Sequence, residues 1–262
     1  MSSDWPRVKI EQIAEVKSGK RLPLGMTLVE GPTPFPYIRL VDVWDGKIQK
    51  NNLKFLTSET RDCIKRYVVN SGDVGLAIVG HTIGMVFYVN PEWNDVNLTE
   101  NAARITNFLE SINSRYLYYY LTSPDGQTEI ISRKVGSAQG KLPLYNIKSL
   151  EIPVPSRREQ DFLVEILDAL SSRIDLLRET NATLEAIAQA LFKSWFVDFD
   201  PVHAKQQGRA PEGLDEATAA RFPDSFEESA LGLVPRGWKH STVEQSFILT
   251  MGQSPPATPT IR

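Results

Sequence analysis

Apolar residues between positions 163 and 195 recur at alternating spacings of four and three, and they define one narrow stripe along a helix. This heptad spacing is typical of a coiled coil, in which one helix packs its stripe against that of another helix. No proline or glycine interrupts the pattern, so we predict a continuous helix within residues 156–200, roughly 50–55 Å long along the stripe. The predicted seam residues are Leu163, Leu167, Leu170, Ile174, Leu177, Asn181, Leu184, Ala188 and Leu191.

The start of this helix is also marked in the sequence. Ser156 is followed three residues later by Glu159, a capping box in which each residue satisfies an amide N–H at the helix start. Asn181 is a polar residue within the seam, where it lowers stability and can fix the register with a partner helix; alternatively, it lies at a hydrated point of the packing. Alternatively, the helix lies on the core of its own domain. Such helices usually carry a wider apolar face, so a partner helix is favoured.

The helical pattern ends in four large aromatic residues, and two acidic residues and a proline follow them. Large aromatic side chains often dominate the binding energy of protein interfaces, so we predict that this end docks a partner protein. The alternative expectation is that the same side chains close a small core between the helix and the segment that follows it. The aromatic residues are Phe192, Trp195, Phe196 and Phe199.

Residues 1–155 are predicted to form one mixed α/β (α+β) domain. Residues 35–48 pair β-forming residues with an Asp-Gly turn, and residues 68–89 contain two apolar runs around a glycine-rich turn. Both segments therefore predict β-hairpins. Residues 112–121 fit either a strand or a helix, and a helix is favoured because their apolar and aromatic residues can share one face.

The beginning of the chain is repeated near its end. Residues 5–20 and 238–253 align at a constant offset, and the segment between the long helix and the second copy, residues 201–235, predicts a connector with one short helix around residues 215–221. The repeat predicts that residues 236–262 begin a second domain like the first, starting with its first strand. The matched pairs are Trp5 with Trp238, Ile10 with Val243, Glu11 with Glu244, Gln12 with Gln245, and Gly19 with Gly252.

Composition narrows the class of protein. The net charge of −3 argues against a generically basic nucleic-acid binder, but residues 1–155 hold 18 basic and 16 acidic side chains, whereas residues 156–262 hold 11 and 16. This asymmetry weakly favours an N-terminal part, residues 1–155, that faces a polyanion, and a C-terminal part, residues 156–262, that faces protein. The single cysteine, Cys63, excludes an internal disulfide framework and suits a reducing compartment. Without a signal sequence or an apolar membrane-spanning run, we expect a cytoplasmic protein that contacts no membrane.

The sequence contains no recognisable catalytic or metal-binding motif. The three histidines and Cys63 lie far apart without metal-ligand spacing, and no phosphate-binding Gly-x4-Gly-Lys-Ser/Thr motif occurs. The segment Asn90-Pro91-Glu92-Trp93 resembles the Asn-Pro-Pro-aromatic motif of amino-methyltransferases, but Glu92 replaces the second proline and no glycine-rich cofactor loop precedes it. We therefore predict no catalytic residue and no metal site. Among the functions considered for this chain, a stand-alone DNA methyltransferase or nuclease is the least favoured.

Two motifs carry a resemblance to a known family. The first is IPVPSRREQ at residues 152–160, and the second is WFVDFDPV at residues 195–202. With the domain, helix and repeat around them, the chain resembles the specificity subunit of type I restriction–modification enzymes. The resemblance implies two target-recognition domains that each read one half of a bipartite DNA site, separated by helices in an antiparallel coiled coil. This chain departs from the pattern because it lacks most of the second domain and the second helix.

The same resemblance implies partners and cofactors. Methylation subunits, and then restriction subunits, assemble on the specificity subunit, which has no active site and directs adenine methylation and restriction of double-stranded DNA. S-adenosylmethionine, ATP and Mg²⁺ are then expected on the partner subunits and none on this chain. An alternative is a half subunit that dimerises through residues 160–195 and reads a palindromic bipartite site. A spacer of about 50 Å would set the two readers about 15 base pairs apart.

For DNA contact we expect cationic side chains in loops to bind phosphates, and side chains with defined donors and acceptors to read bases. The loops at residues 19–25, 80–84 and 136–141 are stronger candidates than any single residue. The expected phosphate contacts are Lys17, Lys20, Arg21, Lys47 and Lys141. The expected base contacts are Arg39 to guanine, Gln139 to adenine, and Ser137, His81 and Thr82.

Overall fold

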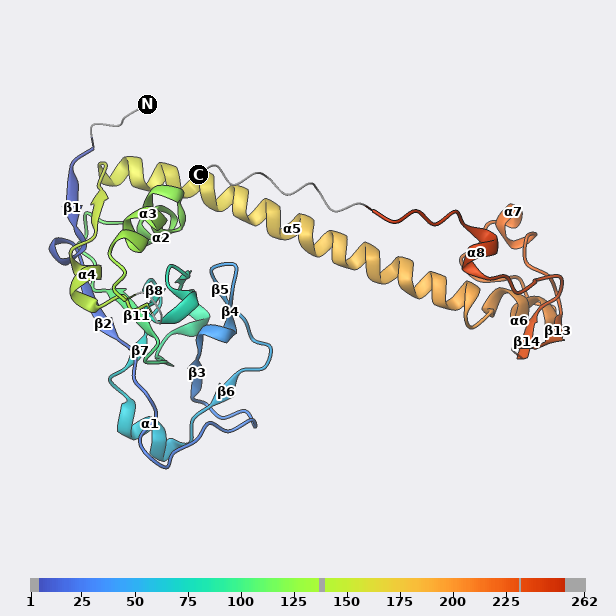
Figure 1. The fold of residues 1–262 in the computed structure, drawn as a ribbon, viewed down its shortest axis with the longest axis horizontal. Coiled ribbons are helices and arrows are strands. Elements are labelled where there is room, and N and C mark those ends of the chain that lie inside the picture. The colour runs from blue at the N-terminus through green and yellow to red at the C-terminus, as the bar shows by residue number, and fades with distance from the viewer. Residues whose placement is uncertain (1–4, 137–139, 231, 253–262) are drawn as a thin grey trace. The chain divides into compact units, whose positions relative to one another are not determined.

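The computed structural model of the 262-residue chain describes residues 5–136, 140–230 and 232–252. The chain divides into two compact units, Met1–Ile174 and Asp175–Arg262, which are described separately (Figure 1). The first unit is a mixed α and β domain followed by the beginning of a long helix, as predicted from the sequence.

An antiparallel sheet in the order β2-β11-β8-β9 forms the centre of the first unit. The apolar residues of β11 are buried on both faces, and Ile105 stands between Val16 of β2 and Val74 of β8 in the main core. β8 and β9 form the hairpin that the two apolar runs predict. The strands are β2 (Glu15–Ser18), β8 (Val74–Ala77), β9 (Val86–Tyr88) and β11 (Ala102–Thr106).

Three helices pack on this sheet. α2 contacts β8 and β9, and α4 contacts β2. Each of the first two helices begins at a side-chain cap: Asn113 accepts from the Arg115 amide, and Ser123 accepts from the Gly126 amide. The helix predicted at residues 112–121 is thus confirmed. The bounds are α2 (Ser114–Thr122), α3 (Pro124–Ser132) and α4 (Leu144–Lys148).

A second sheet, in the order β6-β3-β10-β7, contains one parallel pair, β3 with β10. Phe87 of β9 joins the two sheets, because its fully buried ring lies over Gly75 and packs with Val69 and Leu98 of the second sheet. Helix α1 (Ser58–Ile64) covers the second sheet through Ile64. The strands are β3 (Pro36–Ile38), β6 (Lys54–Phe55), β7 (Val68–Val69) and β10 (Val96–Leu98).

Two further strand pairs and four short 3-10 helices complete the domain. The predicted Asp-Gly hairpin is present, with φ of 50° at Asp45 and 72° at Gly46, as a two-residue turn of this type requires. The first strand of the domain pairs with its last strand. The strands are β4 (Val43–Trp44), β5 (Lys47–Ile48), β1 (Arg7–Lys9) and β12 (Glu151–Pro153). The 3-10 helices are η1 (Ile10–Gln12), η2 (Leu40–Asp42), η3 (Gly80–Thr82) and η4 (Pro91–Trp93).

The predicted long helix is α5, which runs without interruption from Arg157 to Phe196. Its capping box is present: Glu159 Oε2 accepts from the Ser156 amide at 2.9 Å and from the Ser156 hydroxyl at 2.7 Å. These bonds lower the pKa of Glu159. With 40 residues the helix is about 60 Å long, somewhat longer than predicted, because it starts at Arg157, well before the first seam residue, Leu163.

The first turns of α5 are fixed to the first domain beside α2 (Figure 1). Gln160 is fully buried, and its Oε1 accepts from the Asn113 amide at 2.8 Å. Two turns further on, Asp168 Oδ1 accepts from Arg115 Nε and from the Tyr119 hydroxyl, each at 2.5 Å. α5 therefore leaves the domain in a fixed direction through residue 168.

The second unit contains more regular structure than predicted. The connector was expected to hold one short helix around residues 215–221, and α7 confirms it, but a second helix and a β-hairpin are also present. The pattern missed them because α6 starts at an Asp-Pro pair with few apolar residues, and the hairpin strands are only four residues long. The bounds are α6 (Asp200–Gln206), α7 (Glu216–Ala219), β13 (Phe226–Ser229), β14 (Gly232–Pro235) and α8 (Val243–Ser246).

The repeated segments share a local structure. In the first copy the amide of Lys9 donates to Gln12 Oε1 at 2.9 Å, and in the second the amide of Thr242 donates to Gln245 Oε1 at 3.1 Å. These glutamines are the aligned pair, and each stabilises one helical turn. The first strand expected in the second copy does not form among the described residues, because β1 depends on pairing with β12 and the second copy has no such partner there.

Within the described residues, no helix is both long enough and apolar enough to cross a membrane.

Candidate nucleic-acid interface

Three of the predicted loops meet at one edge of the sheet β2-β11-β8-β9. Because the strands are antiparallel, the end of β2, the start of β11, the end of β8 and the start of β9 lie at the same edge. The Lys20 amide donates to the Leu98 carbonyl at 2.9 Å, and the Ile78 amide donates to the Asn101 carbonyl at 2.9 Å. We call this region, residues 19–25, 78–84, 99–101 and 140–142, the loop edge.

The third loop is fastened directly to the second. The Gly80 amide donates to the Gly140 carbonyl at 2.9 Å, and the Leu142 amide donates to the Ile78 carbonyl at 2.9 Å. Lys141 is exposed and pairs with Val79 in an isolated β-bridge. The convergence of loop 80–84 with residues 140–142, the described end of the third loop, follows from these bonds.

The candidate base contacts on these loops differ in how they are held. His81 is exposed at the middle of η3, whereas the Thr82 hydroxyl donates to the Val79 carbonyl at 2.9 Å. His81 is therefore the side chain on this loop that projects into solvent. Ser137 and Gln139 lie outside the described residues.

Lys20 and Arg21 stand on the loop that follows β2. Lys20 Nζ lies 5.4 Å from the centre of the Tyr67 ring, a cation–π contact that leaves its charge accessible. Arg21 Nε donates to Glu100 Oε1 at 2.8 Å, and this hydrogen bond and the charge of Glu100 raise the pKa of Arg21. The Arg21 side chain is 80% exposed, so the pair is a solvent-screened contact that DNA phosphates can compete for.

Arg39 is engaged within the protein. Its Nε and Nη2 donate to the two oxygens of the buried Asp42 at 2.9 and 2.6 Å, and Nη2 also donates to the Asn52 carbonyl at 2.9 Å. The Asp42 hydrogen bond raises the pKa of Arg39. This fork is the same geometry that would recognise guanine, so in this structure Arg39 positions η2 rather than presenting a free fork. Asp42, three residues after Arg39, is the sequence signal for this pair.

Exposed apolar side chains also lie on the loop edge, on η2 and on β4, and the sequence patterns did not single them out. Leu24, Val41 and Trp44 are 104%, 80% and 76% exposed. A hollow of about 500 Å³ lies between η2 and the loop edge, lined by Arg21, Arg39, Val41 and Asn101 among others. Apolar groups of this kind contact thymine methyls or wedge between base steps in protein–DNA complexes, so they extend the candidate interface.

The two remaining predicted lysines lie elsewhere. Lys17 Nζ pairs with Glu15 at 2.5 Å on the face of the sheet, and it stands directly opposite Arg104 in the ladder. Lys47 lines a small hollow of about 40 Å³ with Arg115 and Ser171, beside α5 and not at the loop edge. Spacing along the chain could not separate Lys47 from the loop-edge lysines, because it too follows a glycine turn.

The predicted seam of α5 is exposed over most of its length. Leu163 and Leu167 are partly covered by the first domain, but from Leu170 onward the apolar seam residues are open. The exposed fractions are 57% for Leu170, 49% for Ile174, 49% for Leu177, 58% for Leu184 and 42% for Leu191. Asn181 and Ala188 are also exposed. Such a stripe is typical of a helix that packs against another helix.

The aromatic residues at the end of α5 pack mainly within the second unit. The rings of Trp195 and Phe196 lie 6.3 and 6.0 Å from that of Phe222, and the ring of Phe199 lies 5.6 Å from that of Trp238. The alternative expectation of a small core therefore describes these three residues. Phe192 is 61% exposed and Phe196 is 42% exposed, so docking of a partner at this end stays a prediction.

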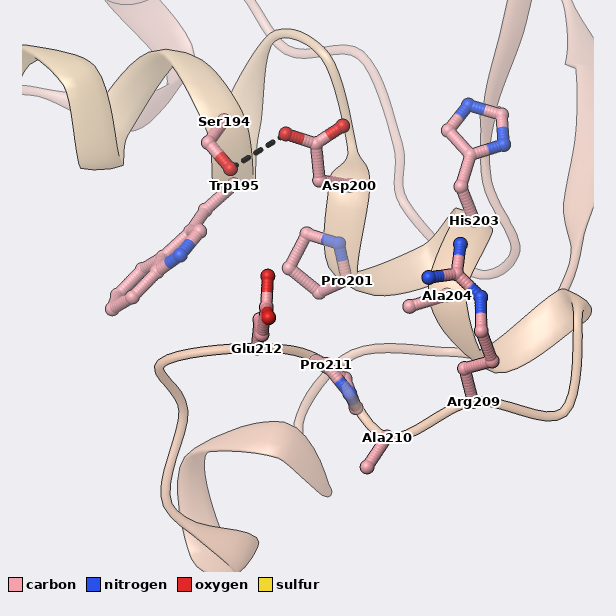
Figure 2. A pocket seen from close by; sticks show the side chains of 10 residues that line it. All are labelled: Ser194, Trp195, Asp200, Pro201, His203, Ala204, Arg209, Ala210, Pro211 and Glu212. Atoms are coloured by element: carbon pink, nitrogen blue, oxygen red, sulfur yellow. Dashed lines mark hydrogen bonds between the residues drawn. The ribbon is translucent and has the colours of Figure 1, made fainter.

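Figure 2 shows a polar hollow of about 410 Å³ beside this aromatic core. The Ser194 hydroxyl points to Asp200 and donates to its Oδ2 at 2.7 Å, which ties the last turn of α5 to the start of α6. Trp195 lies on one side of the hollow with Glu212 beside it, and His203 and Arg209 lie on the other side. Among the described residues, no cluster of histidine, cysteine or acidic side chains could hold a metal ion.

Known proteins are similar to this chain in sequence and in fold. The specificity subunit of the type I restriction enzyme HindI of Haemophilus influenzae is 26% identical over 264 aligned positions, covering 84% of this chain and 56% of that protein. The EcoBI specificity subunit of Escherichia coli is 30% identical over 162 positions, or 58% of this chain and 34% of that protein. This chain thus spans about half the length of the HindI subunit.

The fold is similar to that of the HsdS subunit of Thermoanaerobacter tengcongensis, with a TM-score of 0.51 at 18% identity over 82% of this chain and 52% of that one. A sequence profile described as the type I restriction modification DNA specificity domain matches residues 2–186, which is more than half of the chain. The chain therefore belongs to the family of type I restriction–modification DNA specificity domains.

Proposed function

We propose that this chain recognises a specific double-stranded DNA sequence as a non-catalytic specificity subunit, and that it directs adenine methylation and restriction by partner subunits to a bipartite site. The observation that carries the proposal is the loop edge, where three separate loops join with exposed cations and a projecting histidine. The family assignment supports it, because the HindI and EcoBI relatives are named as specificity subunits of type I restriction enzymes.

The long helix supplies the spacer that a bipartite site requires. A straight helix of 40 residues is about 60 Å long, which corresponds to about 15–18 base pairs at 3.4 Å per pair. The open seam from Leu170 to Leu191 needs a second helix to cover it. A rigid helix pair of this length would hold two reading domains at a fixed separation.

The partners in this proposal are methylation subunits and then restriction subunits. S-adenosylmethionine, ATP and Mg²⁺ are proposed to bind to those subunits. Phe192 and the exposed part of Phe196 are candidates for contact with a methylation subunit, because large exposed aromatic side chains are typical interface anchors.

The open seam also supports a second candidate function. If the helix that covers the seam belongs to another copy of this chain, the protein is a half subunit and its bipartite site is palindromic. Light scattering of the purified 262-residue chain separates the two, because a dimer is expected only for the half subunit.

The central test is co-expression with the cognate methylation subunit, followed by sequencing for methylated adenines. A single bipartite motif is expected, and the symmetry of its halves reports whether one chain or two copies read it. Methylation with no preferred motif, or turnover of S-adenosylmethionine by the isolated chain on DNA, would contradict the proposal.

Two loop-edge variants sharpen this test. His81→Ala should relax the motif at one position by about 10-fold, since a base contact contributes about 1–3 kcal/mol of discrimination. Lys141→Ala should weaken binding to all sequences alike, because a phosphate contact carries no sequence information. Arg158→Ala, an exposed arginine at the start of α5, is the control for loss of one positive charge. If His81→Ala leaves every motif position unchanged, base reading lies elsewhere.

A further inference from the structure

A basic hollow of about 300 Å³ lies beside β2, the edge strand of the sheet β2-β11-β8-β9. Of the predicted DNA-contact residues, only Lys17 belongs to it. The basic hollow is lined by Lys17, Ser18, Arg66, Tyr67, Arg104 and Leu144. Its lining thus offers three positive charges and two hydroxyl groups, and no acidic side chain.

Arg104 is the unusual member of this set. Its side chain is 9% exposed, and its Nε and Nη1 atoms are buried without a hydrogen-bond acceptor among the described residues. The nearest carboxylate is that of Asp73, whose Oδ2 lies 3.7 Å from Arg104 Nη1, beyond hydrogen-bond distance, and accepts instead from the Asn70 amide at 2.9 Å. A buried donor without an acceptor is costly, so a guanidinium retained in this state indicates that an acceptor arrives from outside.

The cations beside Arg104 make a negatively charged acceptor at this place still more favourable. Lys17 and Arg104 stand directly opposite each other on adjacent strands, where like charges are destabilising. Lys17 is partly neutralised by Glu15, but the exposed Arg66 has no hydrogen bond or ion pair within the described part of the chain. Lys20 adds a fourth positive charge, since its Nζ lies over the ring of Tyr67. An anion that bridged these groups would relieve their repulsion.

We propose that the basic hollow binds a phosphate group. Arg104 and Arg66 supply forked donors, Lys17 supplies a point charge, and the hydroxyls of Ser18 and Tyr67 donate to the remaining oxygens. A phosphate group accepts several hydrogen bonds at once, and its negative charge compensates the positive charges of the three cations. The basic hollow continues into the loop edge through Ser18 and Lys20, so the group is either a phosphate of the DNA backbone or a free phosphate anion. Only the first source rests on the proposed function.

The first experiment uses inorganic phosphate and the full chain, without DNA or partner subunits. Phosphate is titrated at constant ionic strength against chloride, and binding is followed by the line width of the ³¹P resonance and by calorimetry. Saturable binding is expected for the wild type, and Arg66→Ala should weaken it at least fivefold. Arg158→Ala, which removes an equally exposed arginine outside the basic hollow, should leave it unchanged.

A buried-residue variant provides a second readout. Phosphate is expected to raise the melting temperature of the wild type, and Arg104→Met should abolish this rise. If Arg104→Met does not fold, the Arg66→Ala comparison alone decides. Equal phosphate binding by wild type, Arg66→Ala and Arg158→Ala would overturn the free-anion form of the proposal.

The second experiment identifies the source. Binding to a random-sequence duplex is measured by fluorescence anisotropy at several salt concentrations, where each phosphate contact contributes a slope of about 0.9. A slope reduced by about one in Arg66→Ala, but not in Arg158→Ala, assigns the DNA backbone. An unchanged slope in Arg66→Ala, together with phosphate binding that Arg66→Ala weakens and Arg158→Ala does not, assigns a free anion. Failure of both experiments overturns the proposal, whereas the methylated motif tests the proposed DNA recognition independently.

Discussion

The open seam of α5 makes a quantitative prediction about association. Leu177 and Leu184 are 49% and 58% exposed in the single chain. Full burial of a leucine contributes about 1.5–3 kcal/mol, so covering the exposed half contributes about 1 kcal/mol per residue. A dimer of this chain, as the half-subunit candidate requires, would bury two such leucines from each copy, four in all. The double variant Leu177→Ala, Leu184→Ala is therefore expected to lose about 4 kcal/mol of association free energy, or about 1,000-fold in dissociation constant.

Sedimentation equilibrium of the full chain measures this constant, and circular dichroism verifies that the helix persists, which alanine favours. Leu176→Ala is the matched control, because Leu176 is 52% exposed on the same helix but lies outside the seam. Its replacement should change the dissociation constant by less than threefold. If Leu176→Ala weakens association as much as the seam variant does, the heptad interpretation is wrong. A wild-type chain that stays monomeric up to high concentration would refute the homodimer.

Further predictions concern stability. Ser156→Ala removes the cap of α5 and should lower the free energy of unfolding by about 1 kcal/mol in a urea titration. Because its hydrogen bonds lower the pKa of Glu159, the stabilisation by this group is complete above its unfolded pKa and is lost as pH falls through the folded value; the acid limb of the stability profile should therefore flatten in Glu159→Gln. Gly75→Ala should cost about 1–3 kcal/mol in thermal denaturation, because the new Cβ would lie 2.0 Å from the Phe87 ring. Asp168→Asn should loosen the start of α5 and increase amide hydrogen exchange there, while a melting profile identical to wild type and unchanged exchange would contradict the role of its contacts.

The long helix and the hairpins were predictable because their signals are local. The heptad spacing and the Ser156–Glu159 box define α5, and the Asp-Gly pair defines the β4–β5 turn, whatever the rest of the chain does. The connector was less predictable, since α6 and the β13–β14 hairpin are short and depend on the aromatic core formed by Phe199, Phe222 and Trp238. That core joins residues distant in sequence, which periodicity does not report.

The candidate interface was predictable as loops but not as individual side chains. The glycine-rich loops converge because the strands that carry them are antiparallel, and that pairing is invisible along the chain. Arg39 was expected to read a base, yet its fork is bound to Asp42. Arg66 and Arg104 were missed because one precedes a strand of the second sheet and the other lies within a buried strand. Only the register of β11 with β2 brings Arg104 to Lys17.

The pairing of β1 with β12 brings Arg7 opposite Pro153, four residues before α5 begins. The segment between β1 and β12 therefore begins and ends at the same place on the domain. Loops of this segment that do not touch α5, such as residues 19–25 and 80–84, can lengthen, shorten or change their side chains without altering the contacts of Asn113, Arg115 and Tyr119 that fix the start of the helix. The proposed DNA preference and the helix geometry can consequently evolve as independent variables, even though both are encoded in one continuous polypeptide.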